Sequence, residues 1–350
     1  MLSADQLARV RGAATRFVRR LAPGVLVLLY HRVIDLPSDP HRLCVTPAHF
    51  GEHLEILQKY GRRLRVRELA AAVRAGRLPR RGIAVTFDDG YADNLHNARP
   101  LLERYDTPGT VFVTSAHVER GHEFWWDELE RIILRPRTLP ATLSLTIDGR
   151  PCTWQLAATS SVATEDVGPD GWDMGRREER GSRAALYRAL YTLLCPLRDD
   201  MRETTLATLR AWAEVPPHAR PTHRPLNMRE TAELAAGGLI ELGGHTVTHP
   251  ILSALDRHSQ WEEIRGGKLR LEEIIGQPVT SFAYPYGSWA RSDYTAETVA
   301  VVREAGFECA CSYRAEAVRR GADPFQLSRA MVLDWDGEEF ERRVRRWFDG

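Results

Sequence analysis

The amino-acid sequence predicts an α/β fold in which a parallel sheet forms a barrel or a barrel-like layer. Short continuous apolar runs, typical of strands buried on both faces, alternate with segments that carry helix signals. Polar clusters directly follow several of these runs. The 350 residues hold roughly six to eight strand–helix units, and 43% of them are hydrophobic, enough for a sizeable core.

The first part of the chain predicts three buried strands separated by helices. A helix is expected to begin at Pro47, because Thr46 can cap it and Pro is favoured at the first helical position. The β-branched and aromatic residues of Gly109–Thr114 suit a pleated, buried surface. The expected strands are 25–33, 83–87 and 109–114, and the further helices are 66–75 and 97–105.

Between about residues 135 and 225 the alternation stops. Residues 143–147 and 152–156 predict a β-hairpin around the turn Asp148-Gly149. A polar, Gly-rich stretch follows, and then helices are expected over 182–194 and 198–214. We interpret this region as an α+β segment inserted into the main domain, where it serves as a lid or contacts substrate.

The alternation resumes after the insertion and supplies the rest of the expected sheet. The predicted strands are 239–243, 281–284, 309–312 and 331–333, and the predicted helices are 227–236, 259–275, 295–305 and 337–348. The main domain is therefore expected to span residues 25–345, preceded by a separate segment, 1–24.

Composition excludes several classes of function. The 48 Lys and Arg residues are balanced by 47 Asp and Glu residues, so the net charge of +1 gives no reason to expect nucleic acid as a partner. The five cysteines lack CxxC spacing, which argues against a disulfide framework or a thiolate zinc site. Cys309 and Cys311 are expected to pack in the core.

Residues 1–24 form a basic amphipathic segment. The apolar run that follows, Val25–Tyr30, is far shorter than the about 20 residues that span a bilayer, and no cleavage site follows a long apolar region. We therefore expect a cytoplasmic protein. The basic segment could contact an anionic membrane surface or could be an ordinary solvated helix.

Three polar clusters follow predicted strands, and catalytic groups of α/β folds gather at such strand ends. They are Asp88-Asp89-Gly90, Gly243–Pro250 and Ser281–Gly287. Each could also be an ordinary turn, because Asp, Gly and Pro are common turn residues. His245 and His249 are four residues apart and can face one metal ion, and one added carboxylate gives a ligand set with an open position, as in catalytic sites.

The motifs TFDDG, HTVTHP and FAYPYG, in this order, resemble those of the polysaccharide deacetylase family, the NodB-homology enzymes of carbohydrate esterase family four. The stretches LLYHRV and LSRAMVLDWDGEEF are similar to the branch with an N-terminal YHR segment. The resemblance covers about residues 25–130 and 226–345. It implies a deformed (β/α)-barrel of about seven strands, a divalent metal that is commonly zinc, and removal of acetyl groups from N-acetylated sugars.

The resemblance also implies roles for individual residues. Asp89, His245 and His249 match the metal ligands, and Asp88 matches the general base. The backbone N–H of Tyr286 corresponds to the donor that stabilises the oxyanion. Tyr284 and Pro285 of the same turn are expected to contact the substrate.

Two positions depart from the family pattern. The late Leu-x-His motif, which usually supplies the acid, reads Leu327-Ser328-Arg329 here. We expect His31 to protonate the leaving amine instead, although a lone His at a strand end can also be structural. Ala283 replaces the arginine that holds the catalytic Asp, and we expect Arg329, or alternatively Arg32, to supply that charge.

Aromatic residues near the motifs are weaker candidates. Trp126 and Trp335 are expected to contact a sugar, and Trp289 could do so, although aromatic pairs often belong to the core. Asp334 could orient a ligand, or it could be a solvated or capping residue.

The expected activity is therefore metal-dependent N-deacetylation of a polysaccharide, oligosaccharide or glycan precursor. The alternatives are hydrolysis of another amide or ester by the same site, and a non-catalytic carbohydrate-binding module of the same fold.

Overall fold

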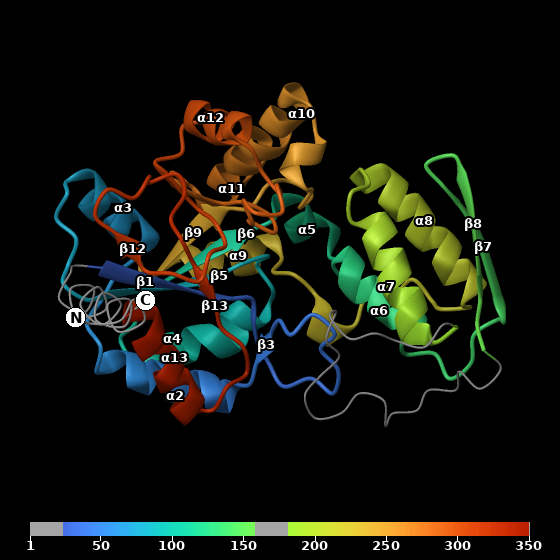
Figure 1. Cartoon of the computed structure of the whole chain (residues 1–350), viewed down its shortest axis with the longest axis horizontal. Coiled ribbons are helices and arrows are strands. Elements are labelled where there is room, and N and C mark those ends of the chain that lie inside the picture. The colour runs from blue at the N-terminus through green and yellow to red at the C-terminus, as the bar shows by residue number, and fades with distance from the viewer. Residues whose placement is uncertain (1–23, 158–180, 350) are drawn as a thin grey trace, which may run out of the picture.

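The computed structural model describes residues 24–157 and 181–349, and a curled, mainly parallel sheet forms its centre (Figure 1). Seven strands follow one another in the order β11-β10-β9-β6-β5-β1-β12, and β12 alone runs antiparallel to its neighbour in this order. Their bounds are β1 Gly24–Tyr30, β5 Gly82–Phe87, β6 Gly109–Val113, β9 Ile240–Gly244, β10 Ser281–Ala283, β11 Cys309–Cys311 and β12 Val318–Arg319. Strand β4 (Arg62–Arg63) also pairs with β5.

The sheet curls because one short segment contacts strands near both of its edges. Leu327 bridges in parallel to Cys311 at the end of β11, and shortly after it β13 (Ala330–Met331) pairs in parallel with β1. The segment thus connects the last parallel strand with β1, which confirms the expected deformed (β/α)-barrel. Arg329 lies in this segment.

Helices cover the outside of the sheet (Figure 1). Their bounds are α2 Pro47–Gln58, α3 Val66–Arg74, α4 Arg99–Arg104, α5 Ser115–Arg120, α9 Met228–Ala235, α10 Arg257–Trp261, α11 Gly267–Ile275, α12 Ala296–Glu304 and α13 Gly337–Asp349, with short helical turns η1 Asn94–Ala98, η2 Pro221–His223, η3 Leu252–Ala254 and η4 Glu262–Gly266. Helix α2 begins as expected, because the Thr46 hydroxyl accepts a hydrogen bond from the His49 N–H. The helix expected over 259–275 is divided by the π-helical turn η4.

The strand expected over 25–33 is interrupted at His31. Strand β1 ends at Tyr30, and the next two residues form β2 (Arg32–Val33), which pairs with β3 (Cys44–Val45) outside the main sheet. The Val33 N–H donates to the Asp93 carboxylate at 2.8 Å, which holds the chain in its new direction. His31 therefore lies where the chain leaves the sheet.

A second hydrophobic core lies beside the barrel, to the right in Figure 1. We call this part the insert; it comprises α6 Trp125–Ile133, β7 Thr142–Ile147, β8 Arg150–Gln155, α7 Arg183–Leu194 and α8 Asp199–Trp212. The expected hairpin is present, and both Asp148 and Gly149 have positive φ, as tight two-residue hairpin turns require. Alternate residues of β7 are buried against the helices. The sequence did not predict α5 and α6.

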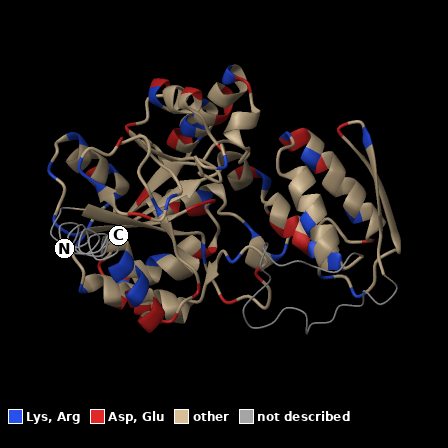
Figure 2. Cartoon of the chain, in the orientation of Figure 1, with Lys and Arg blue, Asp and Glu red and all other residues tan. Residues whose placement is uncertain are grey.

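Charged residues of both signs lie on the outer helices of the barrel and of the insert (Figure 2). On α13, Arg342 and Arg345 each pair with a glutamate four residues earlier. Among the described residues, no helix combines the length and the apolar character needed to span a bilayer. The basic segment 1–24 and its expected membrane contact lie, up to residue 23, outside the described residues. Cys309 and Cys311 are buried free thiols in the core.

Candidate active site

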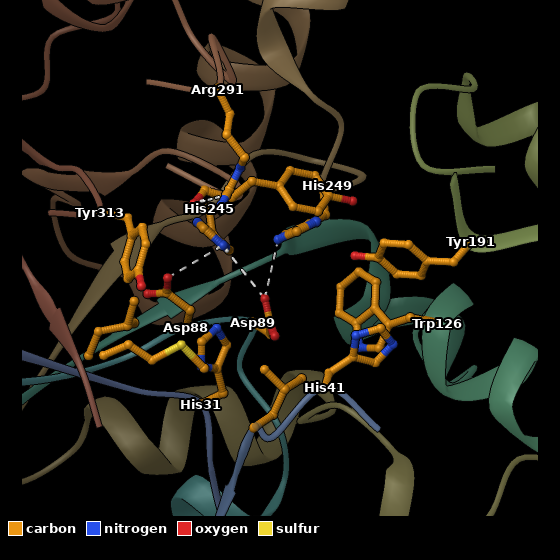
Figure 3. A pocket seen from close by; sticks show the side chains of 14 residues that line it. His31, His41, Asp88, Asp89, Trp126, Tyr191, His245, His249, Arg291 and Tyr313 are labelled. Atoms are coloured by element: carbon orange, nitrogen blue, oxygen red, sulfur yellow. Dashed lines mark hydrogen bonds and ion pairs between the residues drawn. The ribbon is translucent and has the colours of Figure 1, made fainter. Parts of the chain in front are cut away.

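A cavity of about 230 Å³ lies at the carboxyl ends of the parallel strands, between the barrel and the insert. Its residues lie in β1 and β13 and in the loops after β1, β5, β9, β10 and β11, and others come from α6, α7 and the loop before β3. The residues that line it are Leu29, His31, His41, Leu43, Asp88, Asp89, Trp126, Tyr191, His245, His249, Tyr286, Arg291, Tyr313 and Met331. Figure 3 shows the two acidic residues and the two histidines of the motifs grouped at its centre.

Asp89, His245 and His249 form a compact buried cluster. The Asp89 Oδ1 atom lies 3.6 Å from the His245 Nε2 atom and 3.4 Å from the His249 Nε2 atom. One ligand atom from each residue lies within 4.8 Å of the others. The spacing and residue types suit a divalent cation held by two imidazoles and one carboxylate.

The hydrogen bonds of His245 show that its free nitrogen faces this cluster. Its Nδ1–H donates to the Ala283 carbonyl oxygen at 2.8 Å, which leaves Nε2 as the unprotonated nitrogen. This Nε2 atom is buried and has no hydrogen-bond partner among the described residues. Burial lowers the pKa of both His245 and His249, so both rings are neutral, the form in which imidazole binds metal. The residues therefore fit the metal that the motifs imply.

Burial, together with repulsion from Asp88, raises the pKa of Asp89 well above its usual value. A cation bound to the cluster would oppose this shift and keep the carboxylate ionised.

The turn that carries the two histidines is held from behind by Glu263 of η4. The Glu263 carboxylate accepts hydrogen bonds from the N–H groups of Val247 and Thr248, both at 2.9 Å, and from the Thr248 hydroxyl at 2.6 Å. The turn is backbone-strained, with φ of +67° at Thr246 and +61° at His249. Glu263 thus fixes a conformation that these residues do not adopt readily.

Gly267 explains how this part of the helix approaches the turn so closely. A Cβ atom at Gly267 would lie 2.9 Å from the backbone of Thr246, closer than real side chains come. Only glycine permits this packing. π-Helical turns such as η4 are frequent at functional sites.

Asp88 is held by a buried, bidentate pair with Arg329. The Arg329 Nη1 and Nη2 atoms donate to the two Asp88 oxygens at 2.6 and 2.8 Å. Burial acts to raise the pKa of Asp88, but the charge of Arg329, with smaller effects of His245 and the Arg329 hydrogen bonds, lowers it overall. The carboxylate is therefore ionised, with its Oδ2 atom 4.0 Å from the His245 Nε2 atom. Arg32, the alternative partner, instead pairs with Asp93 at 3.0 Å.

His31 lies on the other side of the two aspartates from His245 and His249 (Figure 3). Burial lowers its pKa to about 4, although the charge of Asp88 raises it in part. Its backbone carbonyl accepts a hydrogen bond from Asn94, which fixes the chain where β1 ends. The ring lines the cavity, as an acid that contacts substrate requires.

Tyr286 lines the cavity beside His249, with their ring centroids 4.9 Å apart. Its φ of +60° is unusual for a tyrosine and turns the backbone sharply after β10. No described residue accepts a hydrogen bond from its backbone N–H. That N–H is therefore free to meet a ligand.

Of the four expected sugar-contacting residues, Trp126 lines the cavity and the other three do not. The Tyr284 ring stacks on Tyr294 at 4.0 Å, and its hydroxyl donates to the Phe325 carbonyl, so this side chain belongs to the core. Trp335 packs against Trp347. Pro285 lies in the turn after β10, where its carbonyl oxygen accepts a hydrogen bond from the Gly287 N–H at 2.6 Å.

Two further aromatic and acidic candidates also lie elsewhere. Trp289 is 53% exposed and lies outside the cavity lining. Asp334 accepts hydrogen bonds from Thr46 and His49 at the start of α2, which matches its helix-capping alternative.

Sequence reasoning missed several residues that line the cavity: His41, Tyr191, Arg291 and Tyr313. His41 lies in an irregular loop before β3, and Tyr191 lies on an amphipathic helix where it resembles a core residue. Arg291 lies a few residues beyond the motif turn that ends at Gly287, and Tyr313 lies shortly after the end of β11. Position after a strand was the one signal available, and it applied to Tyr313 only.

The fold and the cluster define an α/β-barrel protein with an Asp-His-His site at the carboxyl ends of its strands. The chain belongs to the polysaccharide deacetylase family, because the family model described as "Polysaccharide deacetylase" matches residues 75–138 and 199–310, just over half of the chain. Residues 139–198, within the insert, lie between the two matched stretches.

Individual proteins show the same likeness. YxkH of Bacillus subtilis (strain 168), a polysaccharide deacetylase by name, is 26% identical over 108 residues. These residues are 30% of this chain and 37% of YxkH, so the match spans well under half of that relative.

Two solved structures share the fold over most of the chain. The Streptococcus pyogenes deacetylase PplD, solved in complex with acetate, has a TM-score of 0.56 and 16% identity, over 92% of this chain and 99% of PplD. IcaB from Ammonifex degensii has a TM-score of 0.55 and 20% identity, over 94% of this chain and 98% of IcaB. At these identities the likeness concerns the fold.

The Arg329–Asp88 pair makes a direct prediction about stability. Replacing Arg329 with Met should lower the free energy of unfolding by about 3–5 kcal/mol, because a buried carboxylate loses its partner. In the double variant with Asp88→Asn the charge is also gone, so the loss should be smaller than the sum of the single losses by about 0.5–3 kcal/mol. Denaturant unfolding of all four proteins gives these values.

A matched control is Arg291→Met. Arg291 also pairs with an aspartate, Asp293, but its side chain is 58% exposed, so the expected loss is only about 0–1 kcal/mol. Equal losses in the free energy of unfolding for the two arginine variants would show that the buried pair stabilises the fold no more than the exposed pair does.

Proposed function

We propose that the protein is a metal-dependent N-deacetylase that hydrolyses the acetamido group of an N-acetylated sugar in a polysaccharide, oligosaccharide or glycan precursor. The observation that carries this proposal is the position of Asp88. Its ionised carboxylate is fixed by Arg329 directly beside the Asp89, His245 and His249 cluster. Family membership supports the same reaction.

The proposed metal is zinc, and its proposed ligands are Asp89, His245 and His249. When bound, a divalent cation would supply an activated water and would polarise the amide carbonyl of the substrate. Asp88 then accepts the proton of the attacking water as general base. Arg329 contacts no substrate in this scheme; it keeps Asp88 ionised and fixes its orientation.

Two further groups complete the scheme. The free N–H of Tyr286 donates to the oxygen of the amide carbonyl as negative charge develops on it. His31, on the other side of the aspartates, is neutral in the free protein because burial lowers its pKa. It takes up the proton that Asp88 has accepted from the water and passes it to the amine as the C–N bond breaks, because an amide anion leaves poorly. Acetate and the free amino sugar are the products.

The proposal is tested by acetate release from N-acetylglucosamine oligosaccharides, measured together with zinc content. Zinc-loaded protein should release acetate, and removal of the metal by a chelator should abolish release until zinc is restored. Asp88→Asn should keep its zinc and lose about 10²–10⁴-fold in rate, the usual effect of a missing general base. His249→Ala should lose the zinc itself.

Asp334→Asn is the control, because Asp334 caps α2 away from the cavity; both its zinc content and its rate should be unchanged. Zinc-loaded protein that releases acetate from no acetylated sugar would support another amide or ester substrate, or a binding module. Full activity of Asp88→Asn would contradict its role as base.

The role of His31 can be separated from a structural one by the choice of leaving group. His31→Gln should slow hydrolysis of an N-acetyl sugar by about 10²–10⁴-fold, since the amine must be protonated to leave. The same variant should hydrolyse 4-methylumbelliferyl acetate almost normally, because the phenolate leaves without a proton. Equal losses on the amide and the ester, at unchanged zinc content, would show that His31 is not the acid.

Glu263 offers a test of the metal site that does not depend on activity. Glu263→Gln weakens the hydrogen bonds that hold the turn of His245 and His249, so zinc affinity should fall by about 10–100-fold, as for other residues that orient metal ligands. Competition with a fluorescent zinc chelator measures this.

The matched control is Glu262→Gln, one residue earlier, where the side chain is 65% exposed and contacts His258 on the surface. Its zinc affinity should equal that of the unmodified protein. A loss of the same size in both variants would contradict a specific role of Glu263.

A further inference from the structure

Side chains surround the metal-ligand cluster on all the sides seen in Figure 3. Tyr313 and Arg291 lie on the barrel side and Tyr191 and Trp126 on the insert side, while His31 and His41 lie below the aspartates (Figure 3). These residues come from loops after β1, β10 and β11, from the loop before β3, and from helices α6 and α7. The cavity is therefore walled by side chains of both the barrel and the insert.

The wall on the insert side is firmly fixed. The His41 Nε2 atom is hydrogen-bonded to the Tyr187 hydroxyl at 2.5 Å, and the His41 ring lies 4.9 Å from the Tyr191 ring. These contacts tie the loop before β3 to helix α7.

Trp126 forms the adjoining part of this wall. The Trp126 ring lies 4.9 Å from the ring of His249, and its indole N–H donates to the Tyr91 hydroxyl at 2.9 Å. Both ends of the indole are thus engaged with the barrel. A sugar chain that ran from the cavity across the insert side would meet these side chains.

The size of the pocket leads to the same conclusion. Its volume of about 230 Å³ lies below the range of about 300–1,000 Å³ typical of pockets for drug-sized ligands. One sugar ring with its acetamido group is smaller than such a ligand and suits a cavity of this size, whereas two adjacent rings do not. The aromatic faces of Trp126 and Tyr191 supply the flat, partly apolar surface against which the C–H face of a single ring can pack.

We infer that the pocket admits one sugar end-on, so that the protein deacetylates a terminal N-acetylated sugar, or a single sugar on a carrier, rather than internal residues of a polymer. This inference rests on the proposed function for its chemistry. The remainder of the substrate lies outside the pocket mouth and contributes little to recognition.

The direct test uses N-acetylglucosamine oligomers of one to five units in β-1,4 and β-1,6 linkage, with the positions of free amines mapped by tandem mass spectrometry. Deacetylation should occur at one terminal unit only, and kcat/KM should not rise beyond the second unit. Free amines at internal units, or a kcat/KM that keeps rising up to four or five units, would overturn the inference.

A variant pair tests the wall itself. Tyr191→Ala opens the insert side and should allow internal units to be deacetylated, while Trp289→Ala, an exposed residue outside the pocket lining, should leave the terminal pattern unchanged. A purely terminal pattern that survives in Tyr191→Ala would show that this side does not close the site.

Binding separates the failure of this inference from the failure of the proposed function. Calorimetry with zinc-loaded Asp88→Asn should give Kd values for the monosaccharide and the trisaccharide that agree within about threefold, since one unit is seated in each case. A tenfold or larger gain for each added unit, or binding of neither sugar, would overturn the inference whether or not any sugar is hydrolysed.

Discussion

The buried pair between Arg329 and Asp88 is the interaction on which the rest of the site depends. A lone carboxylate in this position would be strongly destabilised and would tend to take up a proton; the guanidinium prevents both by donating to both oxygens. Arg329 belongs to the short segment that bridges from β11 to β1. The same segment therefore closes the barrel and positions the proposed base.

Around this pair, the strand ends bring strained turns together. Asp89, Thr246, His249 and Tyr286 all have positive φ, a conformation that costs free energy in residues other than glycine and tends to occur at functional sites. The surrounding fold compensates locally: Glu263 bonds the histidine turn, and Gly267 lets its helix approach that turn. Neighbouring aspartates thus acquire separate proposed roles, because the turn after β5 directs Asp89 to the histidines and Asp88 to Arg329.

The sequence predicted the fold and the centre of the site because strand order and motif position determine both. Asp88, Asp89, His245 and His249 follow buried parallel strands, so their meeting could be expected. Ala283, in place of the family's arginine, directed attention to Arg329. The direction of a side chain within a turn could not be read in this way: Tyr284 points into the core and Trp335 packs under α13. His41 and Tyr191 could not be foreseen, because they reach the pocket only through the docking of the insert against the barrel.

The central claim is that Asp89, His245 and His249 hold a metal. Asp88 does not ligate this metal and stays bound to Arg329. Crystals grown with zinc, with diffraction data collected on both sides of the zinc absorption edge, test this most directly. The account requires one anomalous peak bounded by the Asp89 carboxylate and the two imidazole Nε2 atoms, with both Asp88 oxygens still on Arg329. A peak ligated by Asp88 in place of Asp89, or no peak at this cluster in zinc-saturated protein, would contradict it.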